Sequence, residues 1–342
     1  MADPDDAQVG TRPARRSIVA RIEREAGVPD LASVLADRLT PTDLQSLLLE
    51  VYARRVERRS VPDLVEEYAM NRFTRPAATS AAELVRWDSV AWAALPKEFV
   101  SVELAPVAPL GTTSLLASLS QDWSLSTSRN TEVVSDCTNV LAVEAAARRR
   151  GVPPPGGSVG GPVHLAASHR LLRGQSFTEG PGVHQHFRVF ALVSAARDPG
   201  NWDFEIDATR RHLGFYVDAL RRYCGDSVPL RVAVSTFGPA ARSPGLDERL
   251  VTGLSGMRPE VDVGREESTP GGRAYYRSLR FHLYAMHPEG GEKELVDGGD
   301  VVWGQKLLNN AKERMFISGI GSERLVEFFG PLGRGKRSEP ER

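Results

Sequence analysis

The stretch that most constrains the fold is residues 297–328, DGGDVVWGQKLLNNAKERMFISGIGSERLVEF. It predicts a tight glycine-glycine turn, an amphipathic segment, a short apolar strand, and then Gly319-Ile320-Gly321 leading into a helix. Glycine lets the backbone approach a ligand closely, and a helix start offers free amide hydrogens and a positive dipole end. Arg324, one turn into that helix, is placed to bind phosphate through its planar donors. The spacing indicates a nucleotide site, although glycine pairs before helices are more often plain turns.

Length and composition are those of a globular protein. The chain has 342 residues, 41% hydrophobic and 25% charged, with a formal net charge of -1. This charge gives no general reason to expect binding to nucleic acid or a membrane. Cys137 and Cys224 lie far apart, so neither a disulfide framework nor a structural zinc site is indicated, and a cytoplasmic location is expected. No apolar run is long enough for a signal peptide or a membrane span.

Residues before about 78 show only helical patterns, whereas those after it alternate between strand and helix patterns. Thr42 or Asp43 is the expected N-cap of a helix through Leu44 and Tyr52. We expect four segments: a disordered tail at 1–16, a helical module at 17–78, a mixed α and β domain at 79–332, and a disordered tail at 333–342.

The mixed domain predicts an α+β fold, an antiparallel sheet flanked by helices. No strand is followed by a Gly-x-Gly-x-x-Gly helix, which argues against a dinucleotide-binding fold. Residues 247–270 are polar and poorly patterned. We expect strands at 99–104, 114–120, 123–128, 163–172, 185–194, 230–234 and 279–284, and helices at 79–94, 138–150 and 204–223.

Three polar features remain open from the residues alone. Arg129 to Glu132 is either a solvated turn or a buried site. His184 and His186 share a strand face but lack a third metal ligand nearby, and Cys137 is more typical of a buried thiol than of a nucleophile. In the strand expected at 279–284, Leu279, Phe281 and Leu283 form one face, and Arg280, His282 and Tyr284 form the other, which is either a ligand floor or open to water.

Four segments in order resemble those of the class II aminoacyl-tRNA synthetase catalytic domain, over about residues 80 to 330. The helix and strand before Pro106 resemble its first motif, the dimer interface. Arg173-Gly174-Gln175, the loop after it and the strand at His186-Phe187-Arg188 resemble the second. Ala274-Tyr275-Tyr276 is similar to a histidyl-specific pattern, and residues 297–328 resemble the third motif with its preceding Gly-Gly turn. The similarity is greatest to histidyl-tRNA synthetase and to its paralogue, the regulatory subunit of ATP phosphoribosyltransferase.

The resemblance implies an ATP site in which two arginines are catalytic. Arg173 would contact the α-phosphate and Arg324 the γ-phosphate, while Gln175 replaces a glutamate that contacts adenine. Magnesium is implied only through ATP; no separate metal site is expected. The remaining candidates are Phe187, Gly319 and Gly321 for ATP, Thr112, Glu132, Tyr275, Tyr276, Gly298 and Gly299 for the substrate, and Asp297 and Asp300 as the nearest magnesium ligands.

Several positions depart from the family pattern. Gly271 and Ala274 replace an arginine and an aspartate, and Leu110 stands where a glutamate would hold the substrate amine, a role that Glu132 could take instead. About 18 residues follow Arg324, so no anticodon-binding domain is expected.

Three functional readings follow from the resemblance and its departures. The leading hypothesis is activation of an amino acid or another small carboxylate as its adenylate, by a homodimer, for an acceptor other than tRNA. The alternative is a non-catalytic dimeric regulatory or binding subunit with a protein partner. A third reading is tRNA aminoacylation that uses the N-terminal helices as a tRNA arm.

Overall fold

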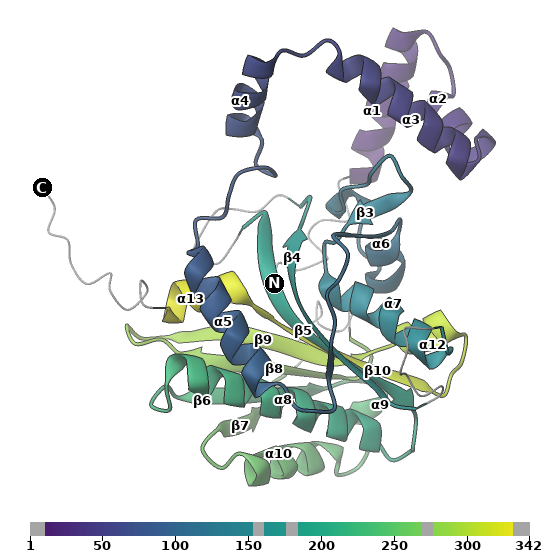
Figure 1. Ribbon diagram of the computed structural model, residues 1–342. Coiled ribbons are helices and arrows are strands. Elements are labelled where there is room, and N and C mark those ends of the chain that lie inside the picture. Colours follow the sequence, from purple (N-terminus) through teal and green to yellow (C-terminus); the bar gives the residue numbers. More distant parts are fainter. Residues whose placement is uncertain (1–10, 153–160, 176–183, 268–275, 331–342) are drawn as a thin grey trace, which may run out of the picture.

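The computed structural model describes residues 11–152, 161–175, 184–267 and 276–330 (Figure 1). Its helical elements are α1 (Thr11–Ala26), α2 (Leu31–Ser33), η2 (Val34–Arg38), α3 (Pro41–Val56), α4 (Val61–Met70), α5 (Ala81–Ala94), α6 (Thr112–Ala117), η3 (Gln121–Trp123), α7 (Cys137–Arg149), α8 (Asp203–Cys224), α9 (Gly238–Ala241), α10 (Leu246–Met257), α12 (Trp303–Leu308) and α13 (Ser322–Phe329). Its strands are β1 (Val100–Ser101), β2 (Val107–Pro109), β3 (Thr131–Val133), β4 (Val163–Leu172), β5 (His186–Arg197), β6 (Leu230–Thr236), β7 (Asp262–Arg265), β8 (Leu279–Met286), β9 (Glu292–Val301) and β10 (Glu313–Gly321).

An eight-stranded sheet forms the centre of the fold. Its strand order is β1-β4-β5-β10-β9-β8-β6-β7, and a second sheet pairs β2 with β3. The β1–β4 and β6–β7 pairs are parallel, and every other neighbouring pair in the large sheet is antiparallel. The expected α+β class, an antiparallel sheet flanked by helices, is therefore confirmed.

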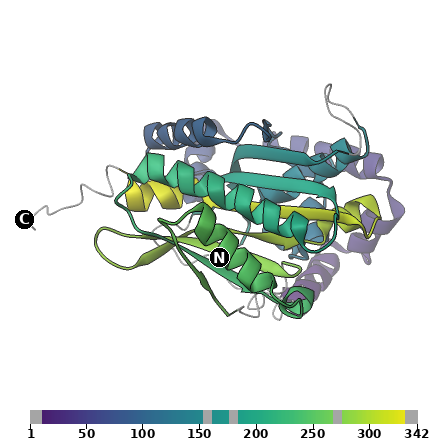
Figure 2. The same cartoon turned by 90° about the horizontal axis from the view of Figure 1, so that it is seen from below.

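One face of the large sheet is packed on helices α5, α8, α10 and α13, and Figure 2 shows α8 and α10 in front of it. Leu279, Phe281 and Leu283 of β8 are fully buried on this face. Because side chains alternate along a strand, Arg280, His282 and Tyr284 must lie on the other face. That second face packs on α7 and α12 beside β4, β5 and β10, so its polar part lies over β8 and β9.

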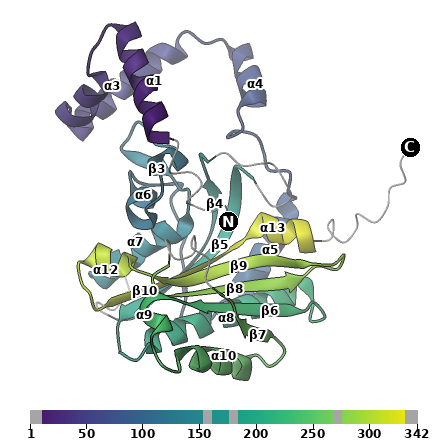
Figure 3. The same cartoon turned by 180° about the vertical axis from the view of Figure 1, so that it is seen from behind.

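The helices α1, α3 and α4 stand on the side of α7 and β3, away from α8 and α10 (Figures 1 and 3). None of their described side chains is buried. These helices and the residues that follow α4 contact the sheet domain through polar groups. Asn130 Nδ2 donates to Pro41 O at 3.0 Å, and Arg72, two residues after α4, donates to Gly174 O at 2.9 Å and to Gln175 O at 3.3 Å. The last contact joins these helices to the hairpin that carries Arg173.

Most of the long elements match the sequence-based expectations. The strands at 163–172, 185–194, 230–234 and 279–284 are confirmed as β4, β5, β6 and β8, and the helices at 79–94, 138–150 and 204–223 as α5, α7 and α8. The helix α1 begins at Thr11, inside the segment expected to be a tail. Thr40, not Thr42 or Asp43, is the N-cap of α3 and accepts a hydrogen bond from the amide of Asp43 at 3.2 Å.

The strand expected at 114–120 is wrong, because Thr112–Ala117 form the helix α6. Its cap comes from a distant carboxylate. Glu132 accepts hydrogen bonds from the amides of Gly111 at 2.9 Å and Thr113 at 3.0 Å, and Gly111 has a φ of 88°. A tertiary contact of this kind supplies what the local sequence lacks.

Other short elements also differ from expectation. The strand expected at 123–128 is wrong, since Gln121–Trp123 are a 3₁₀ turn and only Ser126 makes an isolated bridge. The strand expected at 99–104 is confined to β1. The polar stretch 247–270 contains α10, which buries Leu246, Leu250 and Leu254 at helical spacing, and the edge strand β7.

The glycine-glycine turn expected at Gly298 and Gly299 is wrong, because both residues lie inside β9. A Cβ atom at Gly298 would lie 2.5 Å from Ser318 Cβ. One at Gly299 would lie 2.2 Å from Leu279 O and 2.6 Å from Tyr276 Cδ1. These glycines are needed for close packing rather than for a reversal of the chain.

A buried carboxylate pair lies between the large sheet and α8, with Asp300 on β9 and Glu205 on α8. Burial raises the pKa of Glu205 to about 7 and that of Asp300 to about 6. The Glu205 carboxylate lies 3.5 Å from Arg277 and 3.4 Å from Arg314, and these cations offset only part of the cost of burial. Asp300 Oδ1 accepts hydrogen bonds from the amides of Ser278 at 2.9 Å and Leu279 at 2.6 Å.

We predict that Gly299→Ala lowers the free energy of unfolding by about 1–3 kcal/mol, because the added methyl group overlaps Leu279 O and the Tyr276 ring. Urea unfolding measures the change. The matched control is Gly264→Ala in β7, where a Cβ atom meets nothing within 4 Å. Equal unfolding midpoints for the two variants would contradict the close packing described for β9.

We predict that the folded state loses stability as the pH rises from 4.5 to about 7, because folded Glu205 holds its proton more tightly than the unfolded chain does. The proton held by Glu205 contributes at most about 3 kcal/mol to the free energy of unfolding. Glu205→Gln should remove this part of the pH dependence in chemical unfolding measured across that range. The control is Glu98→Gln, an exposed partner of Arg211. If the stability of Glu205→Gln falls with pH as steeply as that of the wild type, the pH dependence does not come from Glu205.

Candidate functional site

Arg173 and Phe187 come together where β4 ends and β5 begins. The Arg173 guanidinium lies 5.0 Å from the centre of the Phe187 ring. Its Nε donates to Ser135 O at 3.1 Å, and its Nη2 lies 3.8 Å from the Asp136 carboxylate. The guanidinium is thus held against an aromatic ring by two weak polar contacts, with donors left for a ligand.

The hairpin beyond Arg173 is held from two sides. The Gly174 amide donates to Trp123 O at 2.8 Å, and a Cβ atom at Gly174 would lie 2.7 Å from Asp122 O, so this position requires glycine. On the other side Arg72 donates to the carbonyls of Gly174 and Gln175. The sequence gives no signal for this role of Arg72, which depends on a contact between residues far apart in the chain.

Gly319 and Gly321 lie on the same face of the sheet as Phe187. Gly319 pairs with Ala191 and Gly321 with Val189, two positions that share the face of Phe187 by alternation. A Cβ atom at Gly319 would lie 3.0 Å from Val189 Cγ1, whereas one at Gly321 would make an ordinary contact at 3.6 Å. The two glycines leave backbone without side chains on the face of Phe187, opposite positions two and four residues further along β5, and the tighter contact is at Gly319.

Arg324 is in the first turn of α13, directly after β10. Its Nη1 donates to Glu294 O on β9 at 3.3 Å, and the side chain is half-buried. The expected order of a strand, two glycines and a helix bearing an arginine is therefore present. Arg173 and Arg324 reach the sheet from β4 and α13, on either side of β5 and β10.

On β9, Asp297 is the centre of a small polar group. Tyr276 donates its hydroxyl to Asp297 Oδ2 at 2.9 Å, and Arg280 Nη2 lies 3.6 Å from the same oxygen. The Tyr276 ring lies against Gly299 and 5.5 Å from the Arg280 guanidinium. Tyr276 thus fills the space at Gly299, whereas Gly298 faces the other side of the sheet, where a Cβ atom would lie 2.7 Å from Phe281. Substrate binding by Tyr276, Gly298 and Gly299 stays a prediction, and Tyr275 is outside the described residues.

The interpretation of Asp297 and Asp300 as ligands of one magnesium ion is wrong. They are three positions apart along β9, so they lie on opposite faces of the sheet. Asp300 is buried toward α8 beside Glu205, and Asp297 is engaged by Tyr276 and Arg280. Within the described ranges, no group of three or more His, Cys, Asp or Glu side chains is arranged to hold a metal ion.

Glu132 is enclosed by donors and is 1% exposed. Burial raises the pKa of its carboxyl, but hydrogen bonds from Gln121, Thr113 and Gly111 outweigh this and lower the pKa below its ordinary value. The polar cluster from Arg129 to Glu132 is expected to be either a solvated turn or a buried site, and the burial of Glu132 fits the second. The hydrogen bonds of Glu132 stabilise the start of α6. Thr112 is also buried and donates its hydroxyl to Pro109 O at 2.7 Å. Substrate binding by Glu132 and Thr112 stays a prediction.

His184 and His186 make contacts within the protein, and Cys137 is buried. His184 Nε2 lies 2.6 Å from Glu327, and the hydrogen bond to this carboxylate raises the pKa of His184. His186 contacts Arg170 and the carbonyl of Arg75. Cys137 is fully buried, and burial raises the pKa of its thiol, as the interpretation of a buried thiol requires.

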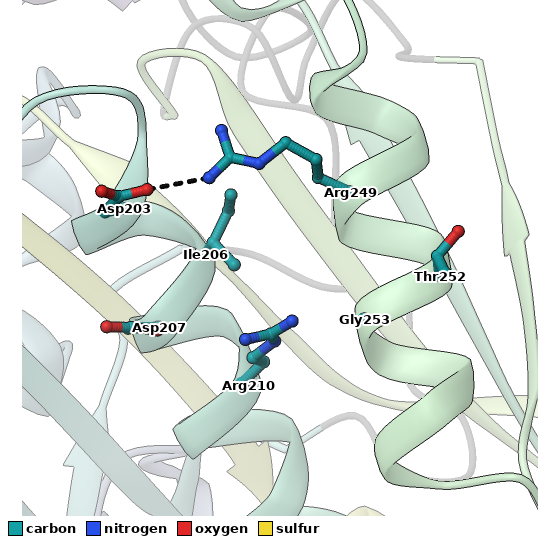
Figure 4. Close-up of a pocket in the computed structure, with 7 residues that line it drawn as sticks. All are labelled: Asp203, Ile206, Asp207, Arg210, Arg249, Thr252 and Gly253. Carbon is teal, nitrogen blue, oxygen red and sulfur yellow. Dashed lines mark hydrogen bonds and ion pairs between the residues drawn. The ribbon is translucent and has the colours of Figure 1, made fainter.

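A cavity of about 420 Å³ lies on the opposite side of the sheet, between α8 and α10 (Figure 4). Arg249 on α10 pairs with Asp203 on α8 at 2.8 Å, and both side chains are about half exposed. No candidate from the sequence lines this cavity. Its lining residues are Asp203, Ile206, Asp207, Arg210, Arg249, Thr252 and Gly253.

Among the described residues, no helix combines the length and the apolar character that a membrane crossing requires. No protein-family model and no curated protein matches the sequence.

Solved structures with a similar fold include three proteins of low sequence identity. An ATP phosphoribosyltransferase regulatory subunit/histidyl-tRNA synthetase from Bacillus halodurans has a TM-score of 0.55 at 12% identity, over 75% of this chain and 83% of that chain. Histidyl-tRNA synthetase from S. aureus has a TM-score of 0.54 at 14% identity, over 78% and 72%. The RNA binding domain of threonyl-tRNA synthetase from Cryptosporidium parvum has a TM-score of 0.54 at 10% identity, over 75% and 65%.

Each of these matches covers at least 75% of this chain. They confirm the fold that the sequence motifs predict. This chain has the fold of the class II aminoacyl-tRNA synthetase-like catalytic domain.

Proposed function

We propose that this chain binds ATP on the face of the sheet bearing Gly319 and activates a small carboxylic acid as its acyl-adenylate. The observation that carries the proposal is the contact of Arg173 with Phe187 on the sheet face where Gly321 and Gly319 leave backbone without side chains, opposite positions two and four residues further along β5. An aromatic ring offers a stacking surface for a base, a guanidinium offers donors for phosphate, and glycine leaves room for both. The acceptor of the acyl group is a molecule other than tRNA.

The proposed reaction joins the acid to the α-phosphorus of ATP. A carboxylate oxygen attacks that phosphorus and forms an acyl-phosphate bond, while the bond from the α-phosphorus to the bridging oxygen breaks and pyrophosphate leaves. Negative charge increases at the phosphorus in the transition state, and fixed cations stabilise it without reorganising. Arg173, which follows β4, and Arg324, on α13, lie on either side of β5 and β10 and are the cations proposed for this role.

The residues present fit ATP better than they fit a protein-bound magnesium ion. Gly319 and Gly321 leave the backbone open, and Arg173 keeps free donors. Asp297 already accepts the Tyr276 hydroxyl at 2.9 Å, and Arg280 Nη2 lies 3.6 Å from the same oxygen. Any magnesium ion is therefore proposed to arrive with the nucleotide, and no step of the reaction is assigned to a magnesium ligand of this chain.

A second candidate is a non-catalytic paralogue that binds a ligand or a partner protein as a homodimer. Leu110 is 47% exposed where the family carries a carboxylate for the substrate amine. Glu132, the substitute, already accepts three hydrogen bonds. These two positions support a site that binds without activating an amino acid.

We predict that Arg324→Ala and Arg173→Ala each weaken ATP binding by about 10-fold or more, because each removes a charged donor from phosphate. Isothermal titration calorimetry measures the affinity, and thermal unfolding checks that each variant folds. Arg249→Ala, which removes an exposed arginine on the opposite face, should bind ATP as the wild type does. Unchanged affinity in both Arg173→Ala and Arg324→Ala would remove the basis of the proposal.

Pyrophosphate exchange separates the two candidates. The folded protein is incubated with ATP, labelled pyrophosphate and, one at a time, the proteinogenic amino acids and simple carboxylic acids. Exchange that depends on one class of acid supports adenylation. ATP binding without exchange for any acid, together with copurification of a second polypeptide, favours the regulatory subunit.

A further inference from the structure

The Arg280 side chain on β8 is nearly buried and makes no hydrogen bond to any residue that the structure describes. Its exposure is 13%, and its Nε is a buried donor without a partner among those residues. The nearest opposite charge is Asp297, at 3.6 Å from Nη2, which exceeds hydrogen-bond length. Among the described residues, no carbonyl or carboxylate accepts a hydrogen bond from this guanidinium. A buried cation with unfilled donors is costly unless a ligand fills them.

His282, two residues further along the same strand face, has the same deficit. Its exposure is 8%, and its Nε2 is buried without a partner. Its Nδ1 lies 3.2 Å from Glu266. Two neighbouring side chains of one sheet face therefore both keep polar atoms that no described group satisfies.

Three other charged groups of this face have partners, and a fourth, Glu294 on β9, lies opposite Tyr284. Arg231 on β6 makes two hydrogen bonds to Glu292, both of 2.7 Å. Asp297 accepts the Tyr276 hydroxyl, and Glu266 faces His282. Arg280 keeps donors that no described group accepts, and an anion is the partner that suits a guanidinium best.

The sheet register places these side chains at the far end of the proposed acid site. Gly319 pairs with Asp297, and Asp297 pairs with His282, so the three lie in one row across β10, β9 and β8. Two strand spacings separate Gly319 from His282, a distance of about 10 Å. Arg280 occupies the next row, beside Gly299. An acid that reacts above Gly319 would reach β8 with its other end.

We infer that Arg280 and His282 bind a second anionic group of the substrate, so that the acid is a small dicarboxylic acid. This inference rests on the proposed activation of an acid at the same site and names its chemical class. Arg280 holds one carboxylate in place, and the other is left to react with ATP. A substrate with a neutral group at this end would leave the Arg280 donors unfilled, and a substrate with a cationic group would be repelled.

Calorimetry with the full chain and no ATP tests the binding step. Succinate and glutarate should bind at least 10-fold more tightly than butyrate. Arg280→Gln should remove this preference, because it keeps a polar side chain but lacks the charge and the planar fork of donors. The matched control is Arg231→Gln on the same face, whose guanidinium is already occupied by Glu292. The control should keep the preference.

Thermal unfolding of each variant shows whether it folds, and His282→Gln gives a second, smaller change at the same site, expected to weaken glutarate binding without abolishing it. Equal affinity of the wild type for glutarate and butyrate, or an unchanged preference in folded Arg280→Gln, would overturn the inference.

Pyrophosphate exchange distinguishes the failure of this inference from the failure of the proposed function. Glutarate binding that depends on Arg280, without exchange, supports the dicarboxylate site and overturns adenylation. Exchange with butyrate that persists unchanged in Arg280→Gln supports adenylation and overturns the dicarboxylate site.

Discussion

The packing of the large sheet on α8 is the constraint on which the site depends. Leu279, Phe281 and Phe316 are buried toward that helix, and this fixes the register of β8 and β10. A shift of one residue would move every side chain of a strand to the other face. The packing of apolar side chains on α8 therefore places Arg280 and Gly319 on the opposite face, although neither residue takes part in that packing.

Glycines then decide how near the functional side chains can come to the sheet. Gly299 lets the Tyr276 ring lie on β9, where its hydroxyl reaches Asp297. Gly174 lets the hairpin pack on Trp123, which places Arg173 beside Phe187. In both cases the absence of a side chain at one position fixes the place of a polar side chain at another.

The sequence predicts well what depends on local pattern. The alternation in β8 and the apolar spacing in α8 place these elements, and the order of glycines before Arg324 gives the strand and helix around it. The sequence cannot show contacts between distant residues: Glu132 capping α6, Arg72 holding the hairpin, and Tyr276 filling the space at Gly299. The glycine pair in β9 has the sequence pattern of a turn, and only the fold reveals the neighbours that exclude a Cβ atom.

The central claim is that the sheet face between Phe187 and Gly319 binds ATP, and photolabelling with an azido derivative of ATP tests it directly. Peptide mapping of the labelled protein should place the label on the peptides of β5 and β10, with unlabelled ATP in excess suppressing it. Label that is confined to α8 and α10, around the cavity at Arg249, or label that excess ATP does not suppress, would contradict the account.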